Sequence, residues 1–549
     1  MAKDENFAMR FATASRWVTI YWSIIWLLTL VNLNTVLVGF HPHHDGLMLS
    51  TIRLLKASLL SDGSYPFNQY GSFWAMPYLV ISLVTPDSLL LFSMRLATMI
   101  LYLITGLLTY RIAKILYGPV VAKVALITLV LSRPLGLEPI PWPSSIGMFL
   151  TVAITYLLII TLNLKHSLRR NLLIALVGAL TIMSILTRIQ IGALTLSFIC
   201  AYFIYTKRHD LLPFAFGFST FSILYSLWLG SLGWLRDSLE DQFVFGWFVA
   251  SSGDTDRTFP KTSLVILFSL VFFIAVLKKN QKLAKALNVG PWIFLIVVCA
   301  GSIYAFFDPS SFQVYLGKFW VAFLLFAIGL FVLNLKDILR KRQHQVLLVG
   351  LMSLANASQV FPLFDSMHAW WGLTPLVVLV SKWVVDFLAP LFGKRTRAFA
   401  LFGLSLVLTF PYVLIAASQG GASMNTEDLG LIYSSSQQAN DYAEKRDFFS
   451  NNIPQNTSVL NLCGDSDLFF DSKRVMSASR YFVYWPTMNA SERIQEEILA
   501  SKPEYVLFCD SVGSGIPEKL KVNFTTNPYK PLASLGAEGS LILYTLAEN

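Results

Sequence analysis

Apolar runs, each roughly 20 residues long and separated by short polar tracts, recur along this chain and constrain its fold most strongly. A helix of that length crosses the hydrocarbon core of a bilayer, whereas a soluble core needs no such runs. Charged residues make up only 13% of the 549 residues, about half the usual share. The first run, 17–40, has no small-residue cleavage site after it, which favours a retained helix. The sequence predicts an α-helical polytopic membrane protein.

The charges between the runs alternate in sign. Basic tracts occur at 111–123, 165–170, 207–208, 278–285, 336–342 and 394–397, and the intervening loops hold acids such as Asp237, Glu240, Asp241, Asp254 and Asp256. This is the positive-inside pattern, which predicts about 13 transmembrane helices, a cytoplasmic N-terminus and an extracytoplasmic C-terminus. The net charge of +10 would suit a nucleic-acid partner, but the basic residues cluster in short tracts between the apolar runs. We therefore expect the lipid bilayer, and no nucleic acid, as a partner.

The composition changes beyond residue 418. Gly, Ser and Asn in 419–436 are typical of a linker, and 437–549 has the texture of a soluble domain. Helical patterns at 437–451 and 491–502 alternate with short apolar runs at 458–463, 505–510 and 540–546. This alternation predicts a small α/β C-terminal extracytoplasmic domain with some parallel strand pairing. The multi-span domain then occupies 1–418.

Two cysteines, Cys463 and Cys509, end two of the predicted strands. If those strands are neighbours, an oxidising outer compartment allows a disulfide between them. Two buried free thiols are an equally good interpretation, and both stay open.

The first outer loop, 41–87, is long. Its apolar residues Met48, Ile52, Leu55 and Leu59 recur at helical spacing, which predicts an amphipathic helix on the membrane surface. An aromatic-rich stretch, 65–80, follows and suits the interface.

Asp45 stands in HPHHDGLMLS (41–50), just before this helix. It is a good N-cap residue, and capping alone would explain it. A second interpretation is a metal site made by His41, His43, His44 and Asp45, although adjacent residues rarely converge on one ion. The third is chemical and requires partners.

The predicted topology supplies partners on the same face as Asp45. They are Arg95, about two turns inside the second span, Arg133, Glu138, Arg188, Lys318 and His368. Ionisable residues at membrane depth are costly and are therefore functional candidates. Together they predict an outward-facing cavity with a carboxylate at its rim and cations below.

Such a cavity suits the transfer of a sugar from a lipid phosphate to a hydroxyl. Cations bind and stabilise the departing phosphate, which needs no strong general acid, and one carboxylate serves as base for the acceptor. A base opposite the leaving group implies inversion at the anomeric carbon. We expect Arg95, Arg188, Lys318 and His368 at the donor phosphate, and His44, Tyr70, Trp142 and Trp370 at the substrate, where aromatic rings can stack on sugars. No metal or other cofactor is expected.

The stretches HHDG (43–46), FNQYGSF (67–73) and FPLFDSMHAWW (361–371) resemble the GT-C superfamily of polyprenyl-phosphate-sugar glycosyltransferases. The resemblance is closest to its protein O-mannosyltransferase, aminoarabinose-transferase and arabinofuranosyltransferase branch. It implies a GT-C-like fold, Asp45 as the catalytic base and, by position, Glu138 as a second acid. The chain departs from the branch in having HDG in place of an acidic pair, which weakens a metal-dependent mechanism. It also has Ser72 where proline often follows Tyr-Gly.

We therefore expect an inverting membrane glycosyltransferase of the cell envelope, in a bacterial cytoplasmic membrane, that uses a polyprenyl-phosphate sugar and a glycan, lipid or protein acceptor. The main alternative is a lipid-linked-sugar flippase or transporter, but the chain shows no pair of matching halves. A non-enzymatic binding or assembly protein is the third possibility. Neither the sugar nor the acceptor can be read from the sequence.

Overall fold

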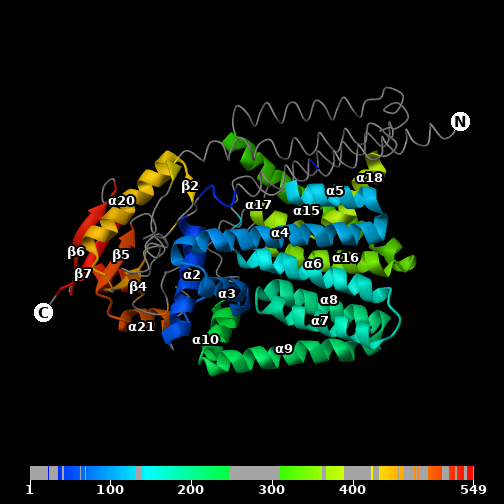
Figure 1. The fold of residues 1–549 in the computed structure, drawn as a ribbon, viewed down its shortest axis with the longest axis horizontal. Coiled ribbons are helices and arrows are strands. Elements are labelled where there is room, and N and C mark those ends of the chain that lie inside the picture. Colours follow the sequence, from blue (N-terminus) through cyan, green and yellow to red (C-terminus); the bar gives the residue numbers. More distant parts are fainter. Residues whose placement is uncertain are drawn as a thin grey trace.

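A computed structural model describes most of the helical part of the chain and much of its C-terminal part (Figure 1). The described residues are 23, 35–39, 42–61, 63–68, 70–131, 139, 141–245, 309–360, 366–388, 422–423, 429, 432–455, 457–462, 475–477, 480, 492–509, 518–525, 528–536 and 541–547.

The main body is a bundle of long apolar helices that lie side by side (Figure 1). In chain order it contains α4 (Asp87–Tyr117), α5 (Pro119–Leu131), α6 (Pro143–Leu162), α7 (Leu168–Ile185), α8 (Ile189–Thr206), α9 (Leu211–Ser231), α15 (Pro309–Arg340), α16 (His344–Ala357) and α18 (Val377–Leu388). Among the described residues, five helical segments are long and apolar enough to cross a membrane: 87–117, 143–162, 168–185, 189–206 and 208–231. The chain is an integral membrane protein, as predicted, and the count of about 13 spans stays a prediction.

Short elements connect the bundle helices. They are η1 (Ser72–Ala75), α3 (Met76–Val84), η2 (Arg208–Asp210), α10 (Leu235–Leu239), the π-helical turn η3 (Glu240–Phe245), η4 (Ser358–Val360) and α17 (Ser366–Leu373).

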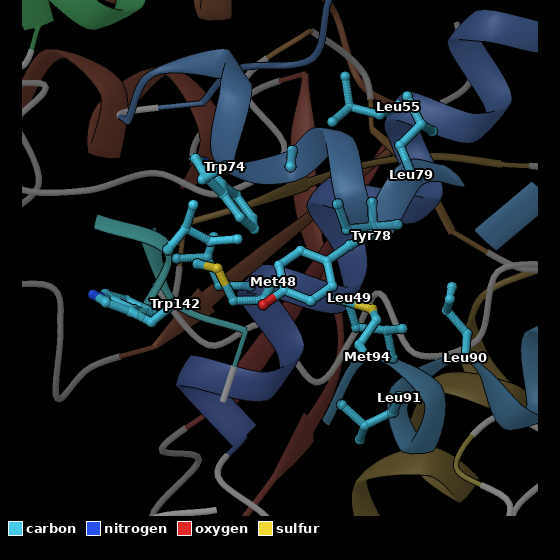
Figure 2. Packing of buried hydrophobic residues seen from close by; sticks show 14 of the residues in the cluster. Met48, Leu49, Leu55, Trp74, Tyr78, Leu79, Leu90, Leu91, Met94 and Trp142 are labelled. Atoms are coloured by element: carbon cyan, nitrogen blue, oxygen red, sulfur yellow. The ribbon is translucent and has the colours of Figure 1, made fainter. Parts of the chain in front are cut away.

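The predicted surface helix exists as α2 (Pro42–Ser61), which runs across one end of the bundle (Figure 1). We call this end the α2 end. Met48, Ile52 and Leu55 are buried, as the spacing predicted, and they join a core with α3 and α4 (Figure 2). Ser50 and Arg53 are buried as well. The helix is therefore covered on more than its apolar face, and Arg53 Nη2 donates to the Asp87 carbonyl at the start of α4 (3.3 Å).

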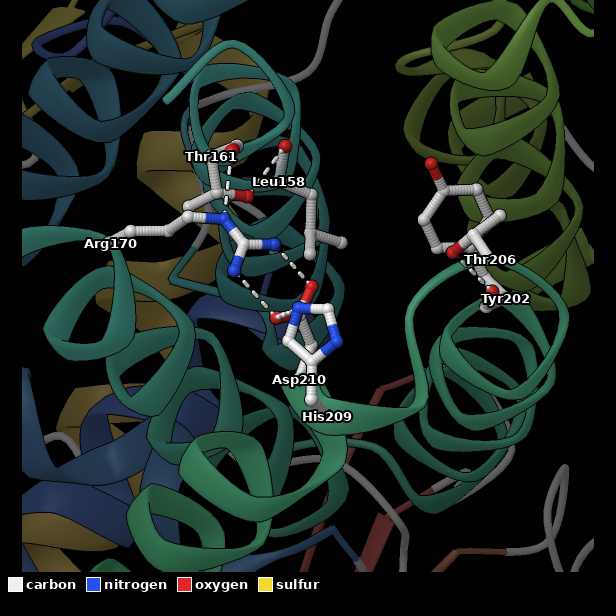
Figure 3. Close-up of polar contacts among 7 residues, drawn as sticks. All are labelled: Leu158, Thr161, Arg170, Tyr202, Thr206, His209 and Asp210. Atoms are coloured by element: carbon white, nitrogen blue, oxygen red, sulfur yellow. Dashed lines mark hydrogen bonds and ion pairs between the residues drawn. The ribbon is translucent and has the colours of Figure 1, made fainter. Parts of the chain in front are cut away.

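The other end of the bundle, the opposite end, carries basic tracts that were predicted to face the cytoplasm. Here α6 ends and α7 begins, and α8 ends and α9 begins. Arg170 and Asp210 form a buried ion pair across these turns, with Arg170 Nη1 2.7 Å from Asp210 Oδ1 (Figure 3). Arg170 Nε also donates to the Thr161 carbonyl at 3.3 Å. The pair thus satisfies a helix-end carbonyl and joins two neighbouring helix hairpins.

The C-terminal part contains a five-stranded mixed sheet with strand order β4-β3-β5-β7-β6. Its strands are β3 (Thr457–Asn461), β4 (Val475–Ser477), β5 (Tyr505–Cys509), β6 (Tyr529–Leu535) and β7 (Leu541–Leu546), with helices α20 (Ser436–Asn452), α21 (Glu492–Ala500) and α22 (Glu518–Thr525). Strands β3, β4 and β5 are parallel, and β7 runs antiparallel to β5 and β6. The small C-terminal α/β part, its partial parallel pairing and five of these elements were predicted.

Strands β3 and β5, which the two cysteines were predicted to end, are neighbours with Asn461 opposite Leu507. Cys463 and the side chain of Cys509 lie outside the described residues, so both interpretations of these cysteines remain as they were.

Described parts of the predicted linker, 419–436, pack against the rest of the chain. Strand β1 (Ala422–Ser423) pairs with β2 (Tyr433–Ser434), and Tyr433 exchanges backbone hydrogen bonds with Leu37 (2.7 Å) and Gly39 (2.8 Å). Leu429 and Ile432 are fully buried. Apolar residues therefore anchor this connection at the α2 end. The Gly- and Ser-rich composition of the segment did not predict this packing.

Candidate functional site

Asp45 and Arg95 form a fully buried ion pair at the α2 end. Arg95 Nη2 lies 2.7 Å from Asp45 Oδ2, and Arg95 Nε lies 3.4 Å from Oδ1. Helix α2 begins at Pro42, so Asp45 belongs to its first turn and does not hold the N-cap position of our first interpretation. Instead its carboxylate meets the guanidinium of a residue two turns inside α4.

Arg95 also holds the chain that leads into α2. Its guanidinium donates to the carbonyls of Val36 (3.3 Å) and Gly39 (2.9 Å). Gly39 has φ +84°, a backbone conformation that favours glycine. Arg95 was predicted to bind a donor phosphate, and that role stays a prediction; in the structure its guanidinium contacts Asp45 and the turn before α2.

The structure brings together three residues that were predicted for the site: Arg188, Tyr70 and Trp142. Arg188 occupies the N-cap position of α8, is 9% exposed and donates to Ser144 Oγ at the start of α6. Its guanidinium carbon lies 5.9 Å from the centre of the Tyr70 ring, and that ring meets Trp142 edge-on at 5.5 Å. We call these four residues, including Ser144, the arginine corner.

The start of α6 supplies a second polar contact. Ser145 Oγ lies 2.7 Å from the Tyr102 hydroxyl, which accepts from Trp371 Nε1 at 3.4 Å. Tyr102, Ser144 and Ser145 were not predicted from the sequence, although two serines opening an apolar span were a visible signal. Trp370 is 3% exposed, donates to the Leu129 carbonyl and packs edge-on against Tyr102. It is therefore part of the core in this structure.

His368 is partly buried, and its ring meets Trp371 edge-on at 5.4 Å. Lys318 lies on α15, but its side chain is outside the described residues, as are the side chain of His44 and all of His41, Arg133, Glu138 and Asp365. Across the described residues, no group of three or more His, Cys, Asp or Glu side chains could hold a metal ion.

Between α2 and η1, Asn68 forms hydrogen bonds with several segments at the α2 end. The side-chain Oδ1 of Asn68 accepts from the Tyr70 amide (3.1 Å) and from Trp74 Nε1 (3.2 Å). Its backbone N–H donates to Asp241 Oδ2 at 3.0 Å. The stretch FNQYGSF contributed to the predictions through its aromatic residues and a family resemblance, and no local pattern marked Asn68 as a residue that joins distant parts of the chain.

Asp241 lies in η3, beyond the span that ends at Ser231, and is 2% exposed. Burial raises the pKa of Asp241 to about 6, and the neighbouring Arg480 guanidinium opposes that rise. The carboxylate is thus one whose charge depends on its arginine partner.

The arrangement has the parts for phosphate chemistry at a membrane surface. Arg188 presents a guanidinium, which suits bidentate phosphate contacts, at the end of a membrane helix and beside two aromatic rings. Asp45 presents a carboxylate in a fixed orientation on the helix that crosses the same end of the bundle.

No protein-family profile and no curated protein sequence matches this chain. Among solved structures, ArnT from Cupriavidus metallidurans bound to undecaprenyl phosphate is similar, with a TM-score of 0.51, 11% identity, and coverage of 97% of this chain and 98% of that one. This chain has the same fold as that structure. The predicted resemblance is confirmed at that level.

Two other structures give lower scores. ArnT in the apo state has a TM-score of 0.47 at 12% identity, covering 97% of this chain and 99% of that one. The archaeal oligosaccharyltransferase AglB from Archaeoglobus fulgidus, in complex with an inhibitory peptide and a dolichol-phosphate, has a TM-score of 0.47 at 12% identity, covering 95% of this chain and 74% of that one.

Proposed function

We propose that this protein is a glycosyltransferase that moves a sugar from a polyprenyl-phosphate donor to a hydroxyl acceptor on the outer side of the membrane, with inversion at the anomeric carbon. The observation that carries the proposal is the fold likeness along nearly the whole chain to an ArnT structure that holds undecaprenyl phosphate. The acceptor is a glycan, a lipid or a protein. The setting is a bacterial cytoplasmic membrane, with the N-terminus inside and the C-terminal part outside.

The donor phosphate binds at the arginine corner. Arg188 has the fork of N–H donors that a phosphate accepts, and it sits at a helix N-terminus, where the helix dipole also favours an anion. Lys318 and His368 complete the cation set in this proposal. Tyr70 and Trp142 offer aromatic surface beside Arg188 for the sugar.

Asp45 is the base that takes the acceptor proton, and Arg95 is a positioning residue for it. In the structure Asp45 is fully buried and both of its oxygens accept from Arg95. The acceptor hydroxyl must therefore approach the Asp45 carboxylate while Arg95 keeps it oriented. Glu138 is the proposed second acid.

The test measures sugar transfer from a panel of radiolabelled polyprenyl-phosphate sugars by the purified protein in native-like membranes. A base contributes roughly 100-fold to 10,000-fold, so Asp45→Asn should lose at least about 100-fold in rate. Arg188→Ala should raise the donor KM, since it removes the cation. The labelled sugar that transfers names the donor.

Asp45→Asn also leaves Arg95 buried without its anion, and a second variant separates that effect from chemistry. In Asp45→Asn/Arg95→Gln neither charge remains, so the fold should recover while transfer stays lost. Arg170→Gln/Asp210→Asn makes the same change at the opposite end and should retain transfer. Full transfer by the Asp45→Asn/Arg95→Gln variant would show that Asp45 has only a structural role. Glu138 would then be the candidate for the base. A wild-type protein that translocates lipid-linked sugar but transfers none would favour the flippase.

A further inference from the structure

The described residues 63–68 and 70–75, which precede α3, contact three parts of the molecule: the C-terminal sheet, η3 and the α7–α8 turn. Phe67 is 4% exposed and belongs to the core of the C-terminal sheet, together with Leu460, Val506 and Phe508. Its amide donates to the Arg480 carbonyl at 2.8 Å. An aromatic residue of the first outer loop is thus part of a core formed mostly by residues some 400 positions later in the chain.

Next to this contact lies the buried pair of Asp241 and Arg480. Arg480 Nη2 is 2.8 Å from Asp241 Oδ1 and Nη1 is 3.0 Å from Oδ2, with side chains 9% and 2% exposed. Removing both charges from water is expensive, so such a pair is weak evidence for stability and better evidence for a fixed geometry. It joins the bundle to the C-terminal part across 239 residues.

The Asp241 carboxylate also accepts from the backbone N–H of Asn68, and the side-chain Oδ1 of Asn68 accepts from the backbone N–H of Tyr70. Asp241 therefore holds Asn68 in place, and Asn68 holds Tyr70. On the far side of Tyr70, Phe73 N donates to the Leu186 carbonyl at 3.0 Å, two residues before Arg188. Tyr70 is held between these two anchors, and its ring lies beside Arg188.

We propose that the C-terminal part positions the arginine corner: Arg480 holds Asp241, Asp241 holds Asn68, and Asn68 sets the Tyr70 ring beside Arg188. Asn68, Asp241 and Arg480 are then positioning residues, and the C-terminal part is needed for donor binding. The inference rests on the proposed function, because it takes the arginine corner as the donor site.

The test compares two double variants of the full-length protein in detergent. Asp241→Ala/Arg480→Ala removes the pair at the α2 end without leaving a buried charge alone, and Arg170→Ala/Asp210→Ala is the matched control. Two quantities are measured: hydrogen exchange of the Tyr70 amide and the Kd for undecaprenyl phosphate. We expect the first variant to speed exchange at Tyr70 and to raise the Kd, each roughly tenfold, and the control to change neither.

Asn68→Ala provides a second route that keeps the ion pair and removes the acceptor for Tyr70 N and Trp74 Nε1, together with the donation from Asn68 Nδ2 to the Tyr65 hydroxyl at 3.5 Å. It should reproduce both effects, even if the double variant unfolds. The inference is wrong if exchange at Tyr70 stays at the wild-type rate in these variants, or if the control weakens undecaprenyl phosphate binding equally. The exchange measurement needs no sugar transfer, so a protein that transfers no sugar counts only against the proposed function.

Discussion

Both ends of the helical bundle contain buried arginine–aspartate ion pairs, but the pairs join different kinds of segments. At the opposite end, Arg170 and Asp210 are 40 residues apart and join the ends of consecutive helix hairpins (Figure 3). At the α2 end, Asp45 pairs with Arg95 across 50 residues, and Asp241 pairs with Arg480 across 239. The pair at the opposite end joins two neighbouring helix hairpins, while those at the α2 end hold α2 and the C-terminal part against the bundle near the candidate site.

The comparison teaches that burial and charge alone do not mark a functional pair. All three pairs are buried, and each arginine approaches its carboxylate with two nitrogens. What differs is the neighbourhood. Asp45 lies on α2 itself and Asp241 accepts from the backbone of Asn68, in the loop that carries Tyr70, whereas Arg170 donates to a helix-end carbonyl.

The largest expected effect is the loss of one partner from a buried pair. Arg95→Gln and Arg170→Gln each leave a buried carboxylate without its cation, which should cost about 3–5 kcal/mol of the free energy of unfolding. Unfolding in detergent, followed by tryptophan fluorescence, measures this. We expect both variants to lose a similar free energy of unfolding, and only Arg95→Gln to lose sugar transfer. If both variants fold correctly and lose sugar transfer equally, the two ends do not differ in function.

A pH effect should belong to the α2 end. Burial raises the pKa of Asp241 from 3.8 to about 6, so the folded protein keeps a proton that the unfolded chain releases. The free energy of unfolding should therefore fall as pH rises from about 4 to about 6, by roughly 3 kcal/mol at 1.36 kcal/mol per pKa unit. Unfolding measured across this range should show the fall in wild type and lose it in Asp241→Asn. A difference between the two proteins that does not change with pH would contradict the prediction.

A smaller effect is expected where the loop approaches the α7–α8 turn. A Cβ atom at Gly71 would lie 1.9 Å from the Leu186 carbonyl oxygen, which is backbone and cannot rotate away. Gly71→Ala should cost about 1–3 kcal/mol and weaken donor binding by displacing Tyr70. Gly329→Ala in α15 is the control, because nothing lies within 4 Å of its Cβ position. It should be neutral or stabilising, so an equal cost in both variants would remove the special role of this close approach.

The smallest effect concerns Ser72, where the chain departs from the resembling family. The Tyr225 hydroxyl donates to Ser72 Oγ at 2.9 Å, and both residues are buried. Ser72→Ala should cost about 1 kcal/mol in thermal unfolding. Ser197→Ala, which removes an exposed hydroxyl bonded to its own helix, should cost less. A cost at Ser72 no greater than at Ser197 would argue that this contact contributes little to the α2 end.

Several features of the candidate site could be predicted in part. Topology placed Arg188, Tyr70 and Trp142 on one face, and they do meet, but their contacts with Ser144 were not predicted. The pairing of Arg95 with Asp45 was not predicted, although two opposite charges buried at one depth favour it. The roles of Arg95, Glu138, Lys318 and His44 stay predictions.

The membrane helices, the basic tracts at their ends, helix α2 and most strands of the C-terminal sheet could be predicted from the sequence. Each of these depends on composition or periodicity within about 20 neighbouring residues. The three-dimensional fold was needed to show that Phe67 completes the C-terminal core, that Asn68 joins Tyr70 to Asp241, and that Arg480 holds Asp241. These contacts are made by single side chains whose partners are set by packing, and one polar residue in a loop carries no periodic signal of the partner that it will meet.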